Sequence, residues 1–271
     1  MRIVINHRTT YSYDQPMRYG LQELRLTPRD TQRQKILEWK IDAPGMEQAL
    51  EFSDAWGNTV HLVNQMDERG QSTISVSGVV ETMKTDGIVG KLKGENTSRL
   101  FVRSTPLTAP NEEISELAEG LRGRHRDHVA LYHAMMQAIR ERMEFDTSST
   151  HSETTAAEAI KNRHGVCQDF SHVFISICRL LDQPARYVTG YLVIEETGEI
   201  ADAHHAWVEA DVAGLGWVGF DPANGVSPDE RYVRLACGLD ASTAAPVRGI
   251  RRGHGNESLE VSVSVNQSSP Q

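Results

Sequence analysis

The chain has 271 residues, of which 39% are apolar and 24% charged, a balance typical of a soluble globular protein with one large core or two smaller ones. Its formal charge of -9 leaves no basic stripe for phosphates, which argues against a nucleic-acid partner. The three cysteines are widely spaced and include no C-x-x-C pair, so neither a disulfide framework nor a thiolate zinc site is indicated.

The first part of the chain, residues 1–110, predicts an antiparallel β-rich domain. Short runs of β-branched or alternating character occur at residues 2–6, 36–41 and 75–80, with proline- and glycine-containing turns between them. Nothing in these runs suggests catalysis. A proline-bounded segment at residues 106–110 is interpreted as the linker to a second domain, which we place at residues 111–265.

Helical patterns open this second domain. Asn111 can cap a first helix, a second helix is expected over about residues 127–143, and Thr155 begins a capping box for a third that ends near Gly165. A fourth, buried helix starts at Val166. After it the period changes to two, which predicts strands at residues 185–194, 205–211, 216–221 and 258–265 before a flexible tail, residues 266–271.

One cysteine occupies the first turn of this fourth helix. Unpaired N–H groups and the helix dipole favour a thiolate over a thiol at that position, so Cys167 is a candidate nucleophile. Cys178 lies about three turns further on, roughly 16 Å along the axis, so the two cannot form a disulfide. We expect Cys178 to be a core residue.

The strands at residues 205–211 and 216–221 should form a hairpin. Alternation puts His205 on the same face as Trp207 and Glu209, and it groups Asp221 with Trp217. A turn centred near Ala213 places His205 opposite Asp221, whereas a slip of one residue would send the two side chains to opposite faces.

These three residues are the set that cysteine attack on an amide requires. Cys167 supplies the thiolate, His205 the imidazolium that protonates the departing amine, and Asp221 the carboxylate that orients the ring. The backbone N–H of Cys167 is a candidate oxyanion donor, and the side chain of Gln168 is a candidate for the second.

Four ordered motifs carry a family resemblance: Gly165-Val-Cys-Gln-Asp-Phe-Ser-His172, Pro184-Ala-Arg-Tyr-Val-Thr-Gly-Tyr191, His205-Ala-Trp207 and Trp217-Val-Gly-Phe-Asp-Pro222. Together they resemble the transglutaminase-like superfamily, in particular its bacterial branch with an N-terminal β-rich domain. Weaker similarities at residues 11–13, 24–29, 56–58 and 245–249 extend the match over most of the chain. Residues 238–243 depart from the more charged and aromatic loop expected in this branch, which leaves substrate recognition open.

The resemblance implies an α+β fold with a papain-like transglutaminase core, in which a helix bearing the cysteine packs on an antiparallel sheet. It also implies that Cys167, His205 and Asp221 form a catalytic triad. Arg186 is then expected to hold the helix against the sheet. Trp207 and Trp217 are expected to pack around the triad, Trp207 as a support of the oxyanion site.

The activity that follows is cysteine-dependent acyl transfer by a cytoplasmic protease or amidase acting on a protein or peptide. Two alternatives stay open: protein-glutamine transamidation, which cross-links proteins, and a non-catalytic protein-binding module on the same fold. No cofactor is implied, no membrane partner is expected, and there is no D-x-D-x-D-G calcium loop. A metal hydrolase is disfavoured because no H-E-x-x-H spacing occurs and adjacent strand residues face opposite ways. Its ligands would be Asp202, His204 and His205, completed by His151, His164 or His172.

Overall fold

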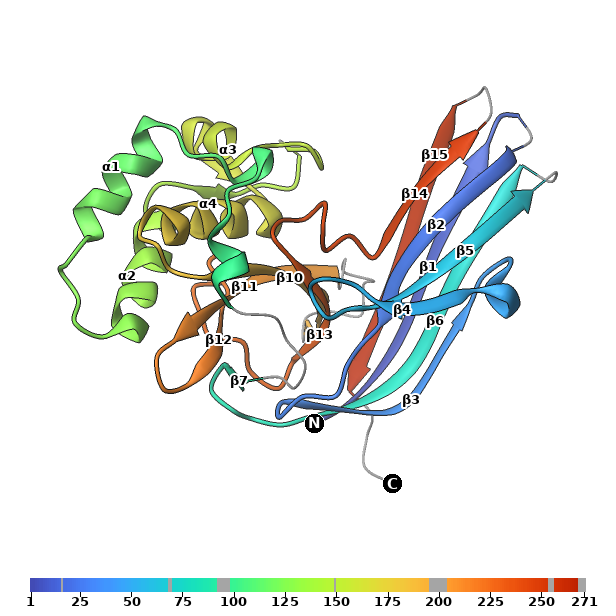
Figure 1. The fold of residues 1–271 in the computed structure, drawn as a ribbon, viewed down its shortest axis with the longest axis horizontal. Coiled ribbons are helices and arrows are strands. Elements are labelled where there is room, and N and C mark those ends of the chain that lie inside the picture. Colours follow the sequence, from blue (N-terminus) through green and yellow to red (C-terminus); the bar gives the residue numbers. More distant parts are fainter. Residues whose placement is uncertain are drawn as a thin grey trace.

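A computed structural model describes residues 1–15, 17–67, 70–91, 98–148, 150–194, 204–252 and 256–267. The fold is α+β, with four helices in the described part of the chain and sheets that are mostly antiparallel, as the sequence predicts. Helices gather on one side of the molecule and long strands on the other, with a five-stranded sheet between them (Figure 1). Within the described ranges, no helix combines the length and apolarity needed to cross a bilayer.

Two four-stranded antiparallel sheets form a sandwich. The first has the order β15 (Glu257–Gln267), β1 (Arg2–Tyr13), β6 (Gln71–Thr82) and β3 (Gln34–Asp42). The second has the order β14 (Val247–Arg252), β2 (Met17–Thr27), β5 (Thr59–Asp67) and β4 (Leu50–Ser53), and η1 (Met46–Gln48) precedes β4. Alternate residues of β1 and β2, such as Ile3, Ile5, Leu24 and Leu26, are fully or almost fully buried between the sheets.

The last two strands lie in a different place from the one expected. The strand predicted at residues 258–265 is present as β15, but it pairs with β1, and β14 pairs with β2. In Figure 1 these late strands lie beside the earliest ones. Both strands, Val247–Arg252 and Glu257–Gln267, therefore belong to the sandwich and not to the sheet of the second domain. The first two residues of the expected tail belong to β15, which reaches Gln267, and residues 268–271 lie outside the described ranges.

The remaining sheet has the order β13 (Tyr232–Gly238), β10 (Ala185–Leu192), β11 (His204–Val212), β12 (Gly216–Phe220) and β7 (Ile88–Gly90). Its helices are α1 (Glu112–Leu121), α2 (His128–Arg140), α3 (Ala156–Asn162) and α4 (Cys167–Leu180). Short 3-10 turns, η2 (Ser98–Val102) and η3 (Pro106–Thr108), precede α1, and a small parallel pair, β8 (Glu144–Phe145) and β9 (His164–Gly165), precedes α4. The expected caps are present: Asn111 Oδ1 accepts the Ile114 N–H, and Thr155 forms a capping box with Glu158.

Both faces of this sheet are buried. Ala206, Val208 and Phe220 pack with the apolar side of α4, which includes Cys178, in one hydrophobic cluster. On the other face, a separate cluster contains Val188, Trp207, Tyr232 and Cys237. Tyr191 and Val233 belong to the same cluster as the core of the sandwich. The sandwich and the sheet therefore share a hydrophobic core, and α4 packs on the face that carries Ala206 and Val208.

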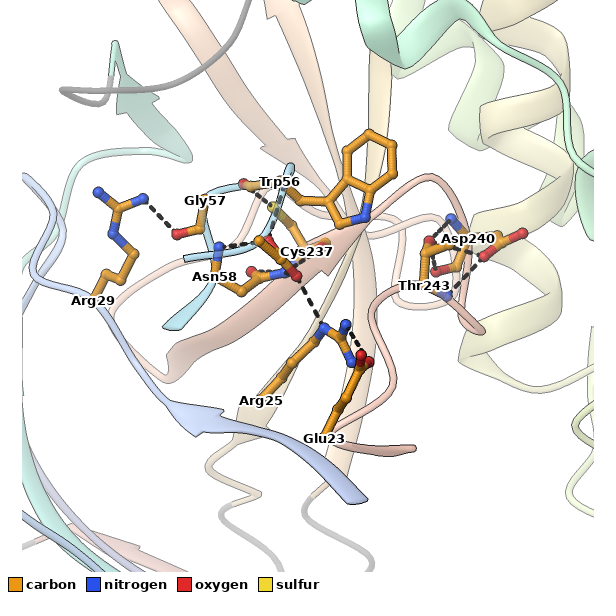
Figure 2. A network of polar contacts seen from close by, with 10 residues as sticks. Glu23, Arg25, Arg29, Trp56, Gly57, Asn58, Cys237, Asp240 and Thr243 are labelled. Atoms are coloured by element: carbon orange, nitrogen blue, oxygen red, sulfur yellow. Dashed lines mark hydrogen bonds and ion pairs between the residues drawn. The ribbon is translucent and has the colours of Figure 1, made fainter. Parts of the chain in front are cut away.

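The outer edge of β13 is closed by side-chain amides from the sandwich. Asn58 donates to the Cys237 carbonyl at 2.8 Å and accepts from the Cys237 N–H at 2.9 Å, as Figure 2 shows. Gln34 makes the same pair of bonds with the backbone of Arg234, each at 2.8 Å. The Asp54 carboxylate accepts the backbone and side-chain N–H groups of Asn58, and it is also paired with Arg25. These amides satisfy the edge as a neighbouring strand would.

Candidate active site

Cys167 is the first residue of α4, as expected, and it is partly exposed. The turn before it is held by Asp169, whose Oδ2 accepts the Val166 N–H at 2.8 Å. Gly165 is required there because a Cβ atom would lie 2.7 Å from the Cβ of Asp169. As the first helical residue, Cys167 has no intrahelical acceptor for its own N–H.

His205 lies near the start of β11 and contacts the carboxylate that the sequence pairs with it. The distance from His205 Nε2 to Asp221 Oδ2 is 2.7 Å, and the Asp221 side chain is fully buried. Both residues lie on the same face of the hairpin. This contact joins two residues that are 16 positions apart in the chain.

The register of the hairpin differs by two residues from the expected one. The predicted turn, centred on Ala213, would pair Ala210 with Gly216, but Ala210 pairs with Val218. The turn is centred on Gly214, and Gly214 and Gly216 both have positive φ angles, 86° and 79°. A shift of two residues keeps each side chain on its face, so His205 still reaches Asp221, diagonally instead of directly across.

The Asp221 carboxylate is fully used. Its Oδ2 accepts from His205, from the Tyr232 hydroxyl at 2.8 Å and from Asn224 Nδ2 at 2.8 Å. Its Oδ1 accepts the backbone N–H groups of Ala223 at 3.0 Å and Asn224 at 3.1 Å. Burial alone would raise the pKa of Asp221, but the hydrogen bond and charge of His205, together with the other donors, outweigh it and lower the pKa. Asp221 is therefore a fixed anion.

His205 joins this carboxylate to the cysteine. Burial lowers the pKa of His205, yet its hydrogen bonds to Asp221 and to the Cys167 side chain, with the charges of both, raise the pKa to about 10. Because Nε2 contacts Asp221, Nδ1 is the ring nitrogen left for the sulfur. The structure thus brings Cys167, His205 and Asp221 together in one hydrogen-bonded series.

Gln168 and Trp207 lie beside this series. The Gln168 side chain donates from Nε2 to the Ser152 carbonyl at 3.1 Å. The Trp207 ring is nearly parallel to that of His205, with 6.4 Å between centroids and 23° between planes. Its buried indole N–H has no hydrogen-bond partner among the described residues. Trp207 therefore covers the imidazole, whereas one amide hydrogen of Gln168 is already bonded.

Neither Trp217 nor Arg186 lies where the resemblance predicted, which was around the triad for Trp217 and between the helix and the sheet for Arg186. Trp217 packs in a separate cluster with Phe101, at 5.2 Å between ring centroids, and does not surround the series. The Arg186 guanidinium lies 4.0 Å from the Trp217 ring centroid and pairs with Glu209 on the neighbouring strand. Glu209 also pairs with Arg234 of β13. Arg186 therefore ties strands of the sheet together on the face away from α4.

Three contributors are absent from the predicted set. Asn224 follows Asp221 in a D-P-A-N-G turn, a pattern in which an Asp side chain commonly accepts nearby backbone N–H groups, so its position was accessible from the sequence. Asp169 could be found as the acidic residue three positions after the helix cap. Tyr232 comes from a different strand, and no local pattern signals its contact with Asp221.

The residues of the disfavoured metal site are engaged elsewhere. His204 Nε2 is 3.0 Å from the Thr189 hydroxyl, and the fully buried His172 accepts the Ala241 N–H at Nε2. Asp202 lies outside the described residues. Within the described part of the chain, no group of three histidine, cysteine or acidic side chains is placed to hold a metal ion.

Comparisons with known proteins identify the family to which this fold belongs. Residues 114–222 match the model of the transglutaminase-like superfamily, and residues 3–81 match that of the bacterial transglutaminase-like N-terminal region. The protein ML0607 of Mycobacterium leprae is 28% identical over 98% of this chain and 98% of its own. Rv2569c of Mycobacterium tuberculosis is 26% identical over 97% of this chain and 92% of its own.

A solved structure has the same fold over the whole length. It is the crystal structure of "a Putative Cysteine Protease from Cytophaga hutchinsonii", which covers 100% of this chain and 92% of its own with a TM-score of 0.75 and 24% sequence identity. The two family models together take in both the β-rich region and the core that carries Cys167, His205 and Asp221. The chain belongs to the transglutaminase-like superfamily, with a bacterial transglutaminase-like N-terminal region ahead of its core.

Proposed function

We propose that this chain is a cysteine-dependent hydrolase of amide bonds in proteins or peptides, with Cys167 as nucleophile, His205 as acid and base, and Asp221 as the residue that orients the ring. One observation carries the proposal. His205 bonds Asp221 through Nε2 at 2.7 Å and is hydrogen-bonded to the side chain of Cys167, a partly exposed cysteine at a helix N-terminus.

In the first half of the reaction, the Cys167 thiolate attacks the carbonyl carbon and the C=O electron pair moves to oxygen. The oxyanion accepts the Cys167 backbone N–H, which has no intrahelical acceptor. The carbon–nitrogen bond then breaks, and the His205 imidazolium gives its Nδ1 proton to the departing amine. This leaves a thioester on Cys167 and a neutral His205.

In the second half, neutral His205 takes a proton from water as the water oxygen attacks the thioester carbon. The carbon–sulfur bond breaks, the acid leaves, and both the Cys167 thiolate and the His205 imidazolium are restored. Asp221 keeps the Nε2–H occupied throughout, so the Nδ1 lone pair stays directed at the reacting atoms.

Gln168 and Trp207 are the two candidates for the second hydrogen-bond donor to the oxyanion. Gln168 has one amide hydrogen bonded to Ser152 and one remaining. Trp207 has a buried N–H with no partner in the described ranges. An unpaired buried donor is costly in a folded protein, so a substrate oxygen would recover that free energy. Slower acylation of Cys167 in only one of the variants Gln168→Ala and Trp207→Phe would single out the donor.

Hydrolysis is preferred to transamidation because water is always present, whereas an amine needs a binding site of its own. A structural neighbour described as a cysteine protease is consistent with this choice. The two reactions share the acyl-enzyme and differ in which nucleophile attacks it. Adding a primary amine during turnover separates them: hydrolysis gives free acid, and transamidation gives an amide of the added amine.

The first test is acylation by p-nitrophenyl acetate, a small activated ester. We expect release of nitrophenolate and one acetyl group on Cys167, located by peptide mass spectrometry. Cys167→Ala should lose both signals, and Cys237→Ala, which removes a thiol outside the site, should keep them. An unmodified Cys167 in the folded wild-type chain would overturn the proposal and favour the binding-module alternative.

A further inference from the structure

A cavity of about 480 Å³ opens beside the start of α4, the helix that begins with Cys167. Cavities that bind small molecules are about 300–1,000 Å³ in volume, so this one has room for a large side chain with its neighbouring backbone. Two lining residues place it: Gln168 directly follows Cys167, and His204 lies on the α4 side of β11, opposite to the His205 side chain. A third is Tyr187, whose pKa is raised by burial and then by the nearby charge of Cys167.

The surface of the cavity is mainly carbon. Its walls include Pro106 and Leu107 on one side and Ala241, Ala245 and Pro246 on the other. Apolar surface of this kind gains free energy when it leaves water, and it offers little to a charged group.

Several polar groups of the lining are bonded within the protein. Asp240 Oδ1 accepts from the Ser242 hydroxyl at 2.8 Å and from the Thr243 N–H at 2.9 Å. His204 is bonded to Thr189, and Gln168 to Ser152. These bonds fix the walls and leave the apolar contacts to select what enters.

The far wall is the segment whose sequence departs from the charged and aromatic loop expected in this branch. The small side chains of this segment leave space for the cavity. Two residues of α4 hold the segment in place. The neutral ring of His172 accepts the Ala241 N–H at 3.1 Å, since burial lowers the pKa of His172 to about 4. The Arg179 guanidinium donates to the Leu239 carbonyl at 2.6 Å. The cavity is therefore formed before any substrate arrives.

We propose that this cavity is a specificity site that binds a large apolar side chain of the substrate, aliphatic or aromatic, next to the carbonyl that Cys167 attacks. The inference rests on the proposed function, since it needs a reactive Cys167. It adds a substrate class: amides that carry such a side chain beside the bond, in preference to charged or small ones.

The test compares alkylating reagents at Cys167 and needs no known substrate. Iodoacetamide is too small to fill the cavity, N-hexyl iodoacetamide can fill it, and a reagent of the same length ending in a carboxylate carries a charge into it. Each buried methylene contributes about 0.8 kcal/mol, or about fourfold in rate. We expect the hexyl reagent to react at least about tenfold faster than iodoacetamide, after correction for their rates with free cysteine, and the carboxylate reagent to show no gain.

Two variants localise the effect. Ala245→Trp fills the cavity and should remove the hexyl preference while the iodoacetamide rate stays within about twofold. Ala130→Trp, on the exposed side of α2, should keep the preference. If Ala245→Trp does not fold, the comparison of the hexyl and carboxylate reagents on the wild-type chain decides by itself.

The outcomes distinguish a failure of the specificity site from a failure of the proposed function. A Cys167 that reacts with iodoacetamide no faster than free cysteine would overturn the proposed function and this inference together. A fast reaction with iodoacetamide but no preference for the hexyl reagent, or an equal preference for the carboxylate reagent, would overturn the specificity site alone.

Discussion

Replacing Asp221 by asparagine removes one charge and changes almost no volume, so it isolates the contribution of the carboxylate. Each carboxylate oxygen accepts at least two donors: His205, Asn224 and Tyr232 at Oδ2, and two backbone N–H groups at Oδ1. An amide has one oxygen. Whichever way the substituted side chain turns, its NH₂ group faces donors, and the stable choice keeps the oxygen toward the three groups at Oδ2.

The size of the effect follows from the charge on His205. The rise in its pKa from 6.5 to about 10 amounts to about 5 kcal/mol in favour of the imidazolium, with Asp221 the largest favourable contributor against the opposing burial. Without the carboxylate the buried ring loses most of this preference and its orientation. We expect kcat for p-nitrophenyl acetate to fall about 10³- to 10⁴-fold, which is about 4–5.5 kcal/mol.

The pH dependence gives a second readout. In the wild-type chain the His205 cation persists until the pH rises through about 10, so the folded state gains stability from it below the ordinary pKa of 6.5 and loses that gain towards pH 10. In Asp221→Asn this loss should occur at lower pH. Urea unfolding followed between pH 6 and 10 measures it.

The control is Asp182→Asn, which makes the same chemical change at an exposed residue paired with Arg99 and should keep full activity. If Asp221→Asn retained more than about a tenth of wild-type turnover while His205→Ala lost it, the carboxylate would not be the orienting group.

Three other substitutions test neighbouring contacts. Tyr232→Phe removes one of the donors to Asp221, and a hydrogen bond to a charged group contributes about 1.5–3 kcal/mol. We therefore expect kcat to drop by about ten- to a hundredfold with KM unchanged, and a KM effect alone would contradict a positioning role. Glu209→Gln leaves the buried Arg186 without a counter-charge and should lower the free energy of unfolding in urea by about 3–5 kcal/mol; a loss below about 1 kcal/mol would refute this. Asn58→Ala should lower it by about 2–3 kcal/mol, because the edge of β13 loses two buried hydrogen bonds, and an unchanged urea midpoint would show that water replaces the amide.

The sequence predicted those features of the site that depend on residues close together in the chain. The start of the helix that carries Cys167 follows from the apolar stripe that begins at Val166. The shared face of His205 and Asp221 follows from strand alternation, which survives the two-residue error in register. That error arose because the positive φ angles of Gly214 and Gly216 determine the turn. The sequence of this segment is compatible with a turn centred on Ala213 and with one centred on Gly214.

The rest depends on contacts between distant segments. Nothing in residues 257–267 distinguishes a strand of the core sheet from a strand that pairs with β1, since both require the same alternation. The same holds for Tyr232, which reaches Asp221 from another strand, and for Arg186, whose partners lie across the sheet. The cavity likewise needs the loop before β14 to meet η3, which the sequence alone does not place.

The pairing of β14 and β15 with β2 and β1 bears on how the chain is made. During synthesis the first strands leave the ribosome with an open edge that only the last strands can cover, more than 200 residues later. The sandwich therefore cannot be completed before the core, in contrast to chains whose N-terminal domains fold first as independent units. Its two open edges must stay free of other chains during that interval, which makes the newly made N-terminal half the segment most in need of chaperone protection.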